Sequence, residues 1–147
     1  MIYKAILFLL CTILYGDIHV FNRSTGTETE LKTLSNTRPL YISAKDLARS
    51  FTSKIYENAE RKKIVLYISG VKVKISGNSS YIIIDEDAYQ MPEITIVRQS
   101  DLYLPAEYFL NLLKSTILPG INFDAKKEHL EIDVIRFNIT DINIDVK

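Results

Sequence analysis

An internal repeat constrains the fold of this chain more than any other feature of its sequence. The segment LYISAKDLARSF at residues 40–51 returns as LYLPAEYFLNLL at residues 102–113. In both segments a short apolar run precedes apolar residues at the spacing i, i+3, i+4, i+7, which is typical of an amphipathic helix. These residues are Ala44, Leu47, Ala48 and Phe51 in the first segment and Ala106, Phe109, Leu110 and Leu113 in the second. Each segment therefore predicts a buried strand that leads directly into a helix.

The residues at the predicted helix starts support this interpretation. Ser43 can accept a hydrogen bond from an N–H group of the first turn, and Asp46, one turn further on, nearly completes a capping box. Pro105 stands at the position of Ser43 in the second segment. Proline is tolerated there because the first helical turn has no N–H bond to lose.

A hairpin is expected after each helix. Residues 54–66 correspond to residues 120–132, with polar turns at residues 58–63 and 124–129 and an insertion near residues 116–119. Further strands are expected at residues 18–21, 29–34, 65–69, 71–76, 81–84 and 94–97. The sequence therefore predicts an α+β fold: an antiparallel β-rich meander with two short helices, built from two pseudo-repeated strand–helix–hairpin units that share one core.

The order of these motifs resembles that of a known family. The motifs are strand-to-helix entries at residues 41–48 and 103–110, an asparagine-containing hairpin at 58–66, the strand GVKVKI at 70–75 and a proline-containing strand at 91–94. They resemble the copper amine oxidase N-terminal-like domain, a non-catalytic stalk module that precedes the catalytic part of some cell-wall enzymes, notably N-acetylmuramoyl-L-alanine amidases. The resemblance covers about residues 18–134. It implies a module that lacks both the catalytic residues and the copper of the oxidases.

The N-terminus predicts export. Residues 1–16 contain Lys4 and then an apolar run at 5–15, which is the pattern of a secretory signal peptide and is too short to span a bilayer. Cleavage is expected after Gly16, and the alternatives are a retained membrane anchor or a lipoprotein modified at Cys11. Cys11 is the only cysteine, so the exported part has no disulfide. The expected location is the periplasm or the extracellular cell envelope.

The remaining chain is divided at residue 135. Residues 17–135 are long enough for one domain with its own core, and they contain the motifs of the family resemblance. Residues 136–147 alternate apolar and polar side chains outside the repeat. They are expected to form a C-terminal strand or the start of a following domain that this sequence lacks. In amidases of the resembling type, another module or the catalytic domain would follow there.

Composition and motifs argue against several functions. The chain has 18 Lys and Arg against 18 Asp and Glu residues, a balance that does not predict nucleic-acid binding. Its two histidines, His19 and His129, lie far apart in sequence, so no zinc site is expected, and His129 is expected in a solvated turn. The acidic residues 85–87 lack the ligand spacing of a calcium loop and are expected to form a solvated turn. No catalytic residue, metal ligand or cofactor is predicted, and the chain itself is not expected to be an enzyme.

Basic side chains on two neighbouring strands and the turn before them could form a patch for anionic wall polymers or lipid headgroups. They are Arg61, Lys62, Lys63, Lys72 and Lys74. The alternative is that these are ordinary solvated positions. The nine tyrosines could include a platform that stacks on glycans, but Tyr41 and Tyr103 recur at one position of the repeat and are expected in the core with bonded hydroxyl groups.

Together these features predict a non-catalytic, secreted cell-envelope module that positions or anchors a cell-wall enzyme or partner. Peptidoglycan or another envelope protein is the expected partner, bound through a surface or an exposed sheet edge, and the membrane is reached only through an uncleaved signal. One alternative is the N-terminal portion of an N-acetylmuramoyl-L-alanine amidase, a peptidoglycan hydrolase whose catalytic domain is absent from this chain. Another is an independent carrier of a small ligand or metal, which predicts a pocket with converging polar groups.

Overall fold

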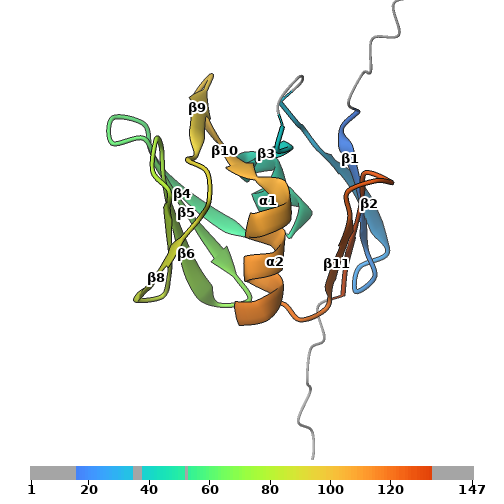
Figure 1. The fold of residues 1–147 in the computed structure, drawn as a ribbon. Helices are drawn as coiled ribbons and strands as arrows, with labels where there is room; N and C mark the ends of the chain where they lie inside the picture. The colour runs from blue at the N-terminus through green and yellow to red at the C-terminus, as the bar shows by residue number, and fades with distance from the viewer. Residues whose placement is uncertain (1–15, 35–37, 52, 134–147) are drawn as a thin grey trace, which may run out of the picture.

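Three β-sheets and two helices make up the described part of the chain (Figure 1). The computed structural model describes residues 16–34, 38–51 and 53–133. The sheets of this part are mostly antiparallel and the helices are short, so the predicted α+β class is confirmed. Apart from Gly16, the predicted signal lies outside the described residues, as does the predicted C-terminal segment 136–147.

The largest sheet has five strands, and each pairs with the next strand along the chain. They are β4 (Lys54–Asn58), β5 (Lys63–Ile68), β6 (Val71–Ser76), β7 (Tyr81–Ile84) and β8 (Asp87–Gln90). The sequence prediction missed β8, because it is a polar edge strand without apolar alternation. The turn predicted at residues 85–87 is shorter than expected, since Asp85 and Glu86 form it and Asp87 already pairs with Ile84.

A four-stranded sheet brings together the two ends of the described chain in the order β11-β12-β1-β2. Its strands are β1 (Ile18–Asn22), β2 (Thr27–Leu31), β11 (Ile121–Asp124) and β12 (His129–Ile132). Strand β1 is antiparallel to β2 but parallel to β12. Parallel neighbours need a long crossover connection. Here the crossover consists of all the chain between β1 and β12, so this sheet joins the two ends of the described chain.

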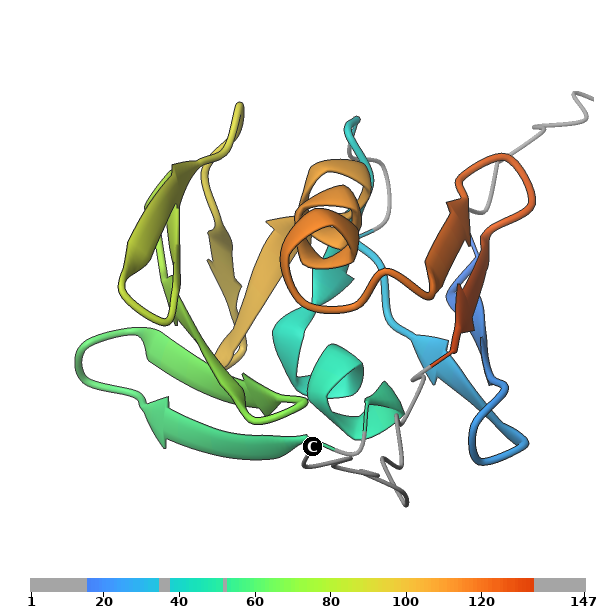
Figure 2. The same cartoon turned by 90° about the horizontal axis from the view of Figure 1, so that it is seen from below.

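The third sheet is small and lies between the other two. It contains β3 (Tyr41–Ser43), β10 (Asp101–Pro105) and β9 (Ile96–Arg98) in the order β3-β10-β9. Helix α1 (Ala44–Ser50) follows β3 directly, and helix α2 (Ala106–Thr116) follows β10. Figure 2 shows both helices between the two larger sheets. Each larger sheet therefore has one face on the core and one face outside.

The helices bury the faces that the sequence predicts. Ala44, Leu47 and Ala48 of α1 are buried, and Phe51 packs against the core at the end of that helix. The equivalent residues of α2, which are Ala106, Phe109, Leu110 and Leu113, are all fully buried. These side chains join the inner faces of all three sheets in one hydrophobic cluster, so the described residues have a single core.

The start of α1 also follows the prediction, with one difference. The Ser43 hydroxyl accepts a hydrogen bond from the Asp46 N–H at 3.0 Å. The Ser43 N–H, however, donates to the Lys32 carbonyl, so it is not available to the Asp46 carboxylate. The carboxylate accepts the Lys32 N–H at 2.9 Å instead, and it pairs with Arg49. What looked like a capping box is therefore a tether between α1 and the segment after β2.

Candidate functional site

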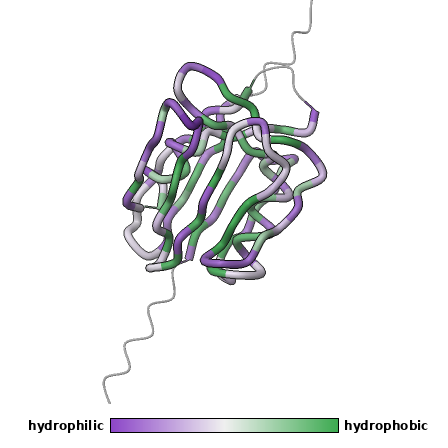
Figure 3. Tube along the Cα trace, turned by 90° about the vertical axis from the view of Figure 1, so that its left-hand side faces the viewer, coloured by the Kyte–Doolittle hydropathy of each residue, from purple (hydrophilic) through white to green (hydrophobic). Residues whose placement is uncertain are grey.

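The outer face of the five-stranded sheet is the most distinctive uncovered surface of the described chain. Side chains alternate between the two faces of a strand, and residues paired across strands share a face. The inward positions of the three central strands β5, β6 and β7 are aliphatic and mostly buried, for example Leu66, Val73 and Ile82. The outward positions carry Lys54, Tyr56, Lys63, Val65, Tyr67, Lys72, Lys74, Tyr81 and Ile83, which we call the tyrosine–lysine face. Figure 3 views this sheet from outside and shows the alternation of hydrophilic and hydrophobic residues along its strands.

Strand register arranges these side chains in rows across the sheet. Lys54, Tyr67 and Lys72 lie in one row, because Tyr67 is paired with both lysines. The Lys72 ammonium lies 5.9 Å from the centre of the Tyr67 ring, within the range of a cation–π contact. The next row contains Tyr56, Val65, Lys74 and Ile83. Tyrosine and aliphatic side chains are therefore interspersed with ammonium groups on this face.

The tyrosines of this face are open to solvent although they sit on a packed sheet. Tyr56 is 59% exposed, Tyr81 51% and Tyr67 39%. Val65 and Ile83 between them are half-buried. A tyrosine ring offers an apolar surface together with a hydroxyl that forms hydrogen bonds, so exposed tyrosines on a rigid support suit contacts with ligands that are partly apolar and partly polar.

The charge of the face is uniformly positive. In the five strands, all of which the structure describes, no outward position carries a carboxylate. Acidic residues lie in the β7–β8 turn, where the Asp85 carboxylate accepts the Lys72 N–H at 3.1 Å. This turn and the side chains of Lys72 and Lys74 line a shallow hollow at one end of the face. The positive charge of the face is therefore partly offset at that end.

The structure does not bring the five predicted basic residues together as one patch. Lys63, Lys72 and Lys74 lie on the tyrosine–lysine face. Arg61 and Lys62 lie in the β4–β5 turn beside it. Lys62 and Lys63 both line a cavity of about 180 Å³, together with Val97 and Leu102 of the small sheet.

Sequence reasoning missed Lys54 and the three exposed tyrosines. A signal was available, because residues 54, 56, 63, 65, 67, 72 and 74 share one face once the two turns at residues 59–62 and 69–70 are fixed. The composition of the face follows from that register. Without the register the tyrosines cannot be distinguished from core tyrosines.

Tyr41 and Tyr103 behave differently from these surface tyrosines. Tyr41 is buried as predicted, and its hydroxyl donates to the Ile94 carbonyl at 2.9 Å. Burial raises the pKa of the Tyr41 hydroxyl, and the Glu93 carboxylate adds to the rise. Tyr103 is only half-buried, and its pKa is also raised, first by burial and then by the Asp101 carboxylate. The prediction of a bonded core tyrosine is confirmed for Tyr41.

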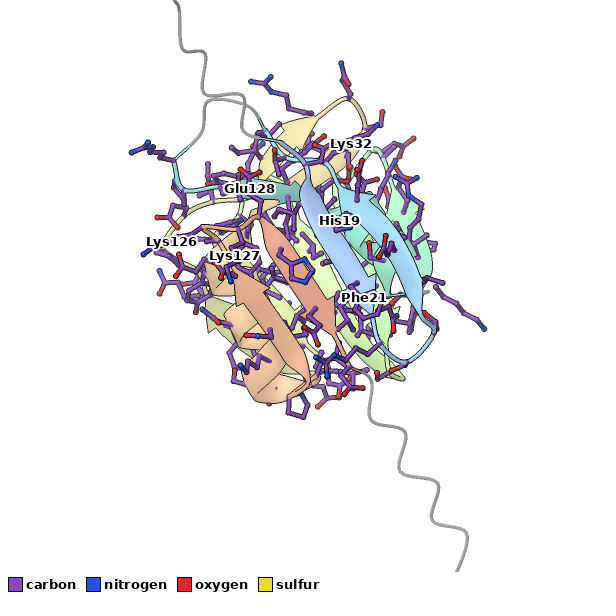
Figure 4. The ribbon with its side chains drawn as sticks, turned by 90° about the vertical axis from the view of Figure 1, so that its right-hand side faces the viewer. His19, Phe21, Lys32, Lys126, Lys127 and Glu128 are labelled. Atoms are coloured by element: carbon purple, nitrogen blue, oxygen red, sulfur yellow. The ribbon has the colours of Figure 1, made fainter. Side chains whose placement is uncertain are left out.

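The two histidines lie side by side, which the sequence did not indicate. His19 and His129 are directly paired on the parallel strands β1 and β12, and their ring centres are 6.2 Å apart. His129 was expected in a solvated turn, but it is the first residue of β12 and half-buried. Figure 4 shows His19 on the outer face of the four-stranded sheet. In the described residues, no group of three or more His, Cys, Asp or Glu side chains is arranged to hold a metal ion.

Comparisons with known proteins identify no relative. No protein-family model, curated protein or solved structure matches the chain. Among the described helices, none has the length and apolar character needed to cross a membrane. The resemblance to the copper amine oxidase N-terminal-like domain therefore stays a prediction, and a functional proposal has to be argued from the surface.

Proposed function

We propose that this chain is a non-catalytic, exported module of the cell envelope that positions a cell-wall enzyme or other partner by binding an anionic wall polymer. The tyrosine–lysine face carries the proposal. Peptidoglycan combines sugar rings with peptide carboxylates, so it presents apolar ring faces and negative charges in alternation. The resemblance of the sequence to the stalk domain of wall amidases favours the same assignment.

The dimensions of the face suit an extended chain rather than a single small molecule. Neighbouring strands lie about 4.8 Å apart, so the distance from β4 to β7 is about 15 Å. Side chains at i and i+2 along a strand are separated by about 6.8 Å. The three exposed tyrosines are distributed over β4, β5 and β7, so a ligand that touches all of them must cross the sheet.

The strength of each contact predicts weak binding that depends on many repeated units. A cation–π contact at an exposed site contributes about 0.5–1 kcal/mol, and an exposed ion pair contributes a similar amount or less. Salt screens exposed charges, whereas ring contacts are less sensitive to it. A polymer that offers many equivalent sites converts such weak contacts into retention through a high effective concentration. The module should therefore bind sacculi better than it binds short fragments.

A pull-down on insoluble peptidoglycan sacculi across a salt series tests this function. The full chain should be retained, and part of the retention should survive about 0.5 M salt, where interactions between exposed charges are largely screened. The triple variant Tyr56→Ser, Tyr67→Ser, Tyr81→Ser should lose that salt-resistant fraction. The double variant Lys72→Gln, Lys74→Gln should lose mainly the fraction seen at low salt.

Matched controls change the same kinds of residue elsewhere. Ile94→Ser removes another exposed apolar side chain, which is 52% exposed, and Lys126→Gln with Lys127→Gln removes two lysines of the β11–β12 turn. Both controls should bind like the unchanged chain. Absence of binding at every salt concentration, or equal losses in the controls, would contradict the proposal and favour a spacer or a protein-docking module.

We further propose that the module contains an internal repeat, with β3, α1, β4 and β5 as the first unit and β10, α2, β11 and β12 as the second. The similarity of residues 40–51 to residues 102–113 supports this proposal. So does the pairing of β3 with β10, which is centred on Ile42 opposite Leu104, two residues at equivalent positions of the two segments. Antiparallel pairing about equivalent residues is what a local two-fold axis requires.

A further inference from the structure

A small cavity lies between two hairpins, beside the tyrosine–lysine face. One hairpin joins β4 to β5 and the other joins β9 to β10, and Figure 1 shows both turns at the same end of the molecule. The cavity has a volume of about 180 Å³. Pockets for drug-sized ligands have volumes of about 300–1,000 Å³, so this one suits a group of a few carbon atoms.

The walls of the cavity are mainly apolar. They include Ala59 and Ile64 of the first hairpin and Val97 and Leu102 of the second. Val97 and Leu102 are paired across β9 and β10. Both pack so closely on Gly77 that a Cβ atom there would lie 2.5 Å from the Val97 Cγ2 atom. These walls therefore favour a small apolar group in the cavity.

The β4–β5 turn beside the cavity is held by hydrogen bonds. The Gly77 N–H donates to the Lys62 carbonyl at 2.7 Å, and the Lys62 N–H donates to the Ala59 carbonyl at 3.2 Å. The Asn58 side-chain oxygen accepts the Arg61 N–H at 3.0 Å. The cavity is therefore built into the fold, and a ligand that enters it loses little free energy to the ordering of this turn.

The charged residues of the cavity leave two ammonium groups available. Both carboxylates that line it are engaged, since the Glu57 Oε1 atom lies 2.8 Å from the Lys45 Nζ atom and the Asp101 carboxylate accepts the Lys45 N–H at 3.3 Å. Lys62 and Lys63 also line the cavity, and neither forms an ion pair with another described residue. An anionic group at the cavity therefore meets positive charge that the protein has not neutralised.

Two uncharged polar groups favour a peptide over a simple organic acid. Within the part of the chain that the structure describes, the Asn58 side-chain nitrogen and the Ser100 hydroxyl have no hydrogen-bond partner. Both residues line the cavity, so they can bond to a peptide group next to a carboxylate. We propose that the cavity binds the free C-terminal end of a peptide arm of the wall polymer. The methyl group of its last alanine lies in the apolar part, and its carboxylate lies near Lys62 and Lys63.

This inference rests on the proposed function for the source of the peptide. Lys63 belongs to the tyrosine–lysine face as well as to the cavity, so a polymer strand that crosses the face brings its peptide arms close to the cavity. An arm whose terminal carboxyl group has been crosslinked presents an amide in place of the negative charge. The cavity would therefore select the uncrosslinked ends of the wall peptides.

Backbone amide NMR of the isotope-labelled full chain, titrated with N-acetyl-D-alanyl-D-alanine, tests the site. The signals of residues 57–64 and 97–102 should shift. The C-terminal amide of the same peptide should bind at least about fivefold more weakly, because it lacks the negative charge. Isobutyrate should also bind at least about fivefold more weakly, because it lacks the peptide group.

Two variants outside the tyrosine–lysine face test the cavity itself. Lys62→Gln removes one ammonium group and should weaken peptide binding about two- to fivefold, which corresponds to one exposed ion pair. Ala59→Leu fills part of the cavity and should weaken binding by more than that. The matched controls Lys126→Gln and Ala88→Leu change exposed residues that do not line the cavity, and they should bind like the unchanged chain.

The inference is wrong if the peptide does not shift these signals, if the amide or isobutyrate binds as tightly, or if the cavity variants bind like their controls. The pull-down on sacculi separates this failure from that of the proposed function. Retention that depends on Tyr56, Tyr67 and Tyr81 without peptide binding in the cavity would overturn this inference alone. Peptide binding without retention would overturn the proposed function, and with it the wall as the source of the peptide.

Discussion

Two aspartates join segments that are distant in sequence, because their carboxylates accept hydrogen bonds from backbone N–H groups. The Asp46 carboxylate accepts a hydrogen bond from the Lys32 N–H. The Asp101 carboxylate accepts hydrogen bonds from the Ser43 hydroxyl, the Lys45 N–H and the Leu102 N–H. Removal of either carboxylate would leave partly buried donors without these partners and would destabilise the fold. Asp46 therefore connects α1 to the segment after β2, and Asp101 connects β10 to the start of α1.

At the residue scale too, Tyr41 makes the stability of the fold depend on pH in the alkaline range. Its pKa is raised above 10.0 in the folded state, first by burial and then by Glu93. The protonated hydroxyl is therefore favoured by folding. Its contribution to stability is fully present below the unfolded pKa of about 10 and is lost as pH rises through the folded pKa.

Urea unfolding of the unchanged chain and of Tyr41→Phe at pH 9 and pH 11 measures this contribution. The difference between the two unfolding free energies isolates the tyrosine from other groups that titrate in this range. The unfolding free energy of the unchanged chain relative to that of Tyr41→Phe should fall between pH 9 and pH 11, because tyrosine can ionise at position 41 and phenylalanine cannot. A difference that stays constant would show that Tyr41 does not ionise with a raised pKa.

At the scale of elements, the pairing of β3 with β10 organises the core. Ile42 and Leu104 are both fully buried and lie opposite each other in the register. Each strand leads directly into a helix, and each helix is followed by a hairpin in one of the larger sheets. Damage to this pairing should therefore affect both larger sheets.

A double-mutant cycle on these two residues tests that dependence. Ile42→Ala and Leu104→Ala should each lower the free energy of unfolding by about 2–5 kcal/mol, because each removes buried aliphatic groups. The two losses should not be additive, because residues in contact typically couple by about 0.5–3 kcal/mol. Val65→Ala on the outer sheet face is the control, with a smaller effect. Additive losses would indicate that β3 and β10 stabilise the fold independently.

The sequence predicted those features of the fold that depend on residues close together in the chain. The buried faces of α1 and α2 follow from it, as does the start of α1 at Ser43, because helical periodicity and capping depend on residues within one turn. Strand β8 was missed because a polar edge strand has no apolar alternation. The parallel neighbours β1 and β12 were missed because their contact depends on how the whole chain closes.

The same distinction applies to the candidate surfaces. The lysines of β5 and β6 could be found from the sequence, since the alternation at residues 71–76 places them on a solvated face. Their tyrosine neighbours depend on hairpin register, and the histidine pair depends on the parallel contact of β1 with β12. Function at a surface assembled from several strands is therefore harder to predict than a core assembled from one helix face.

At the scale of the whole molecule, two layers of sheet enclose the helices and leave two outer faces with different chemistry (Figures 1 and 2). The tyrosine–lysine face is cationic and aromatic, and we assign it to an anionic wall polymer. On the opposite face His19 and His129 lie side by side, and the Glu28 carboxylate lies near His19. A module with its binding surface on one side could hold a partner away from the wall on the other.

The measurement that tests the wall-binding claim most directly is a backbone amide NMR titration of the isotope-labelled full chain with soluble peptidoglycan strands of several repeating units released from sacculi. We predict that the shifted signals concentrate in β4, β5, β6 and β7, and that they weaken in the triple tyrosine variant. Shifts centred on any other surface, or no shifts at a strand concentration that saturates a known wall-binding module, would contradict the claim.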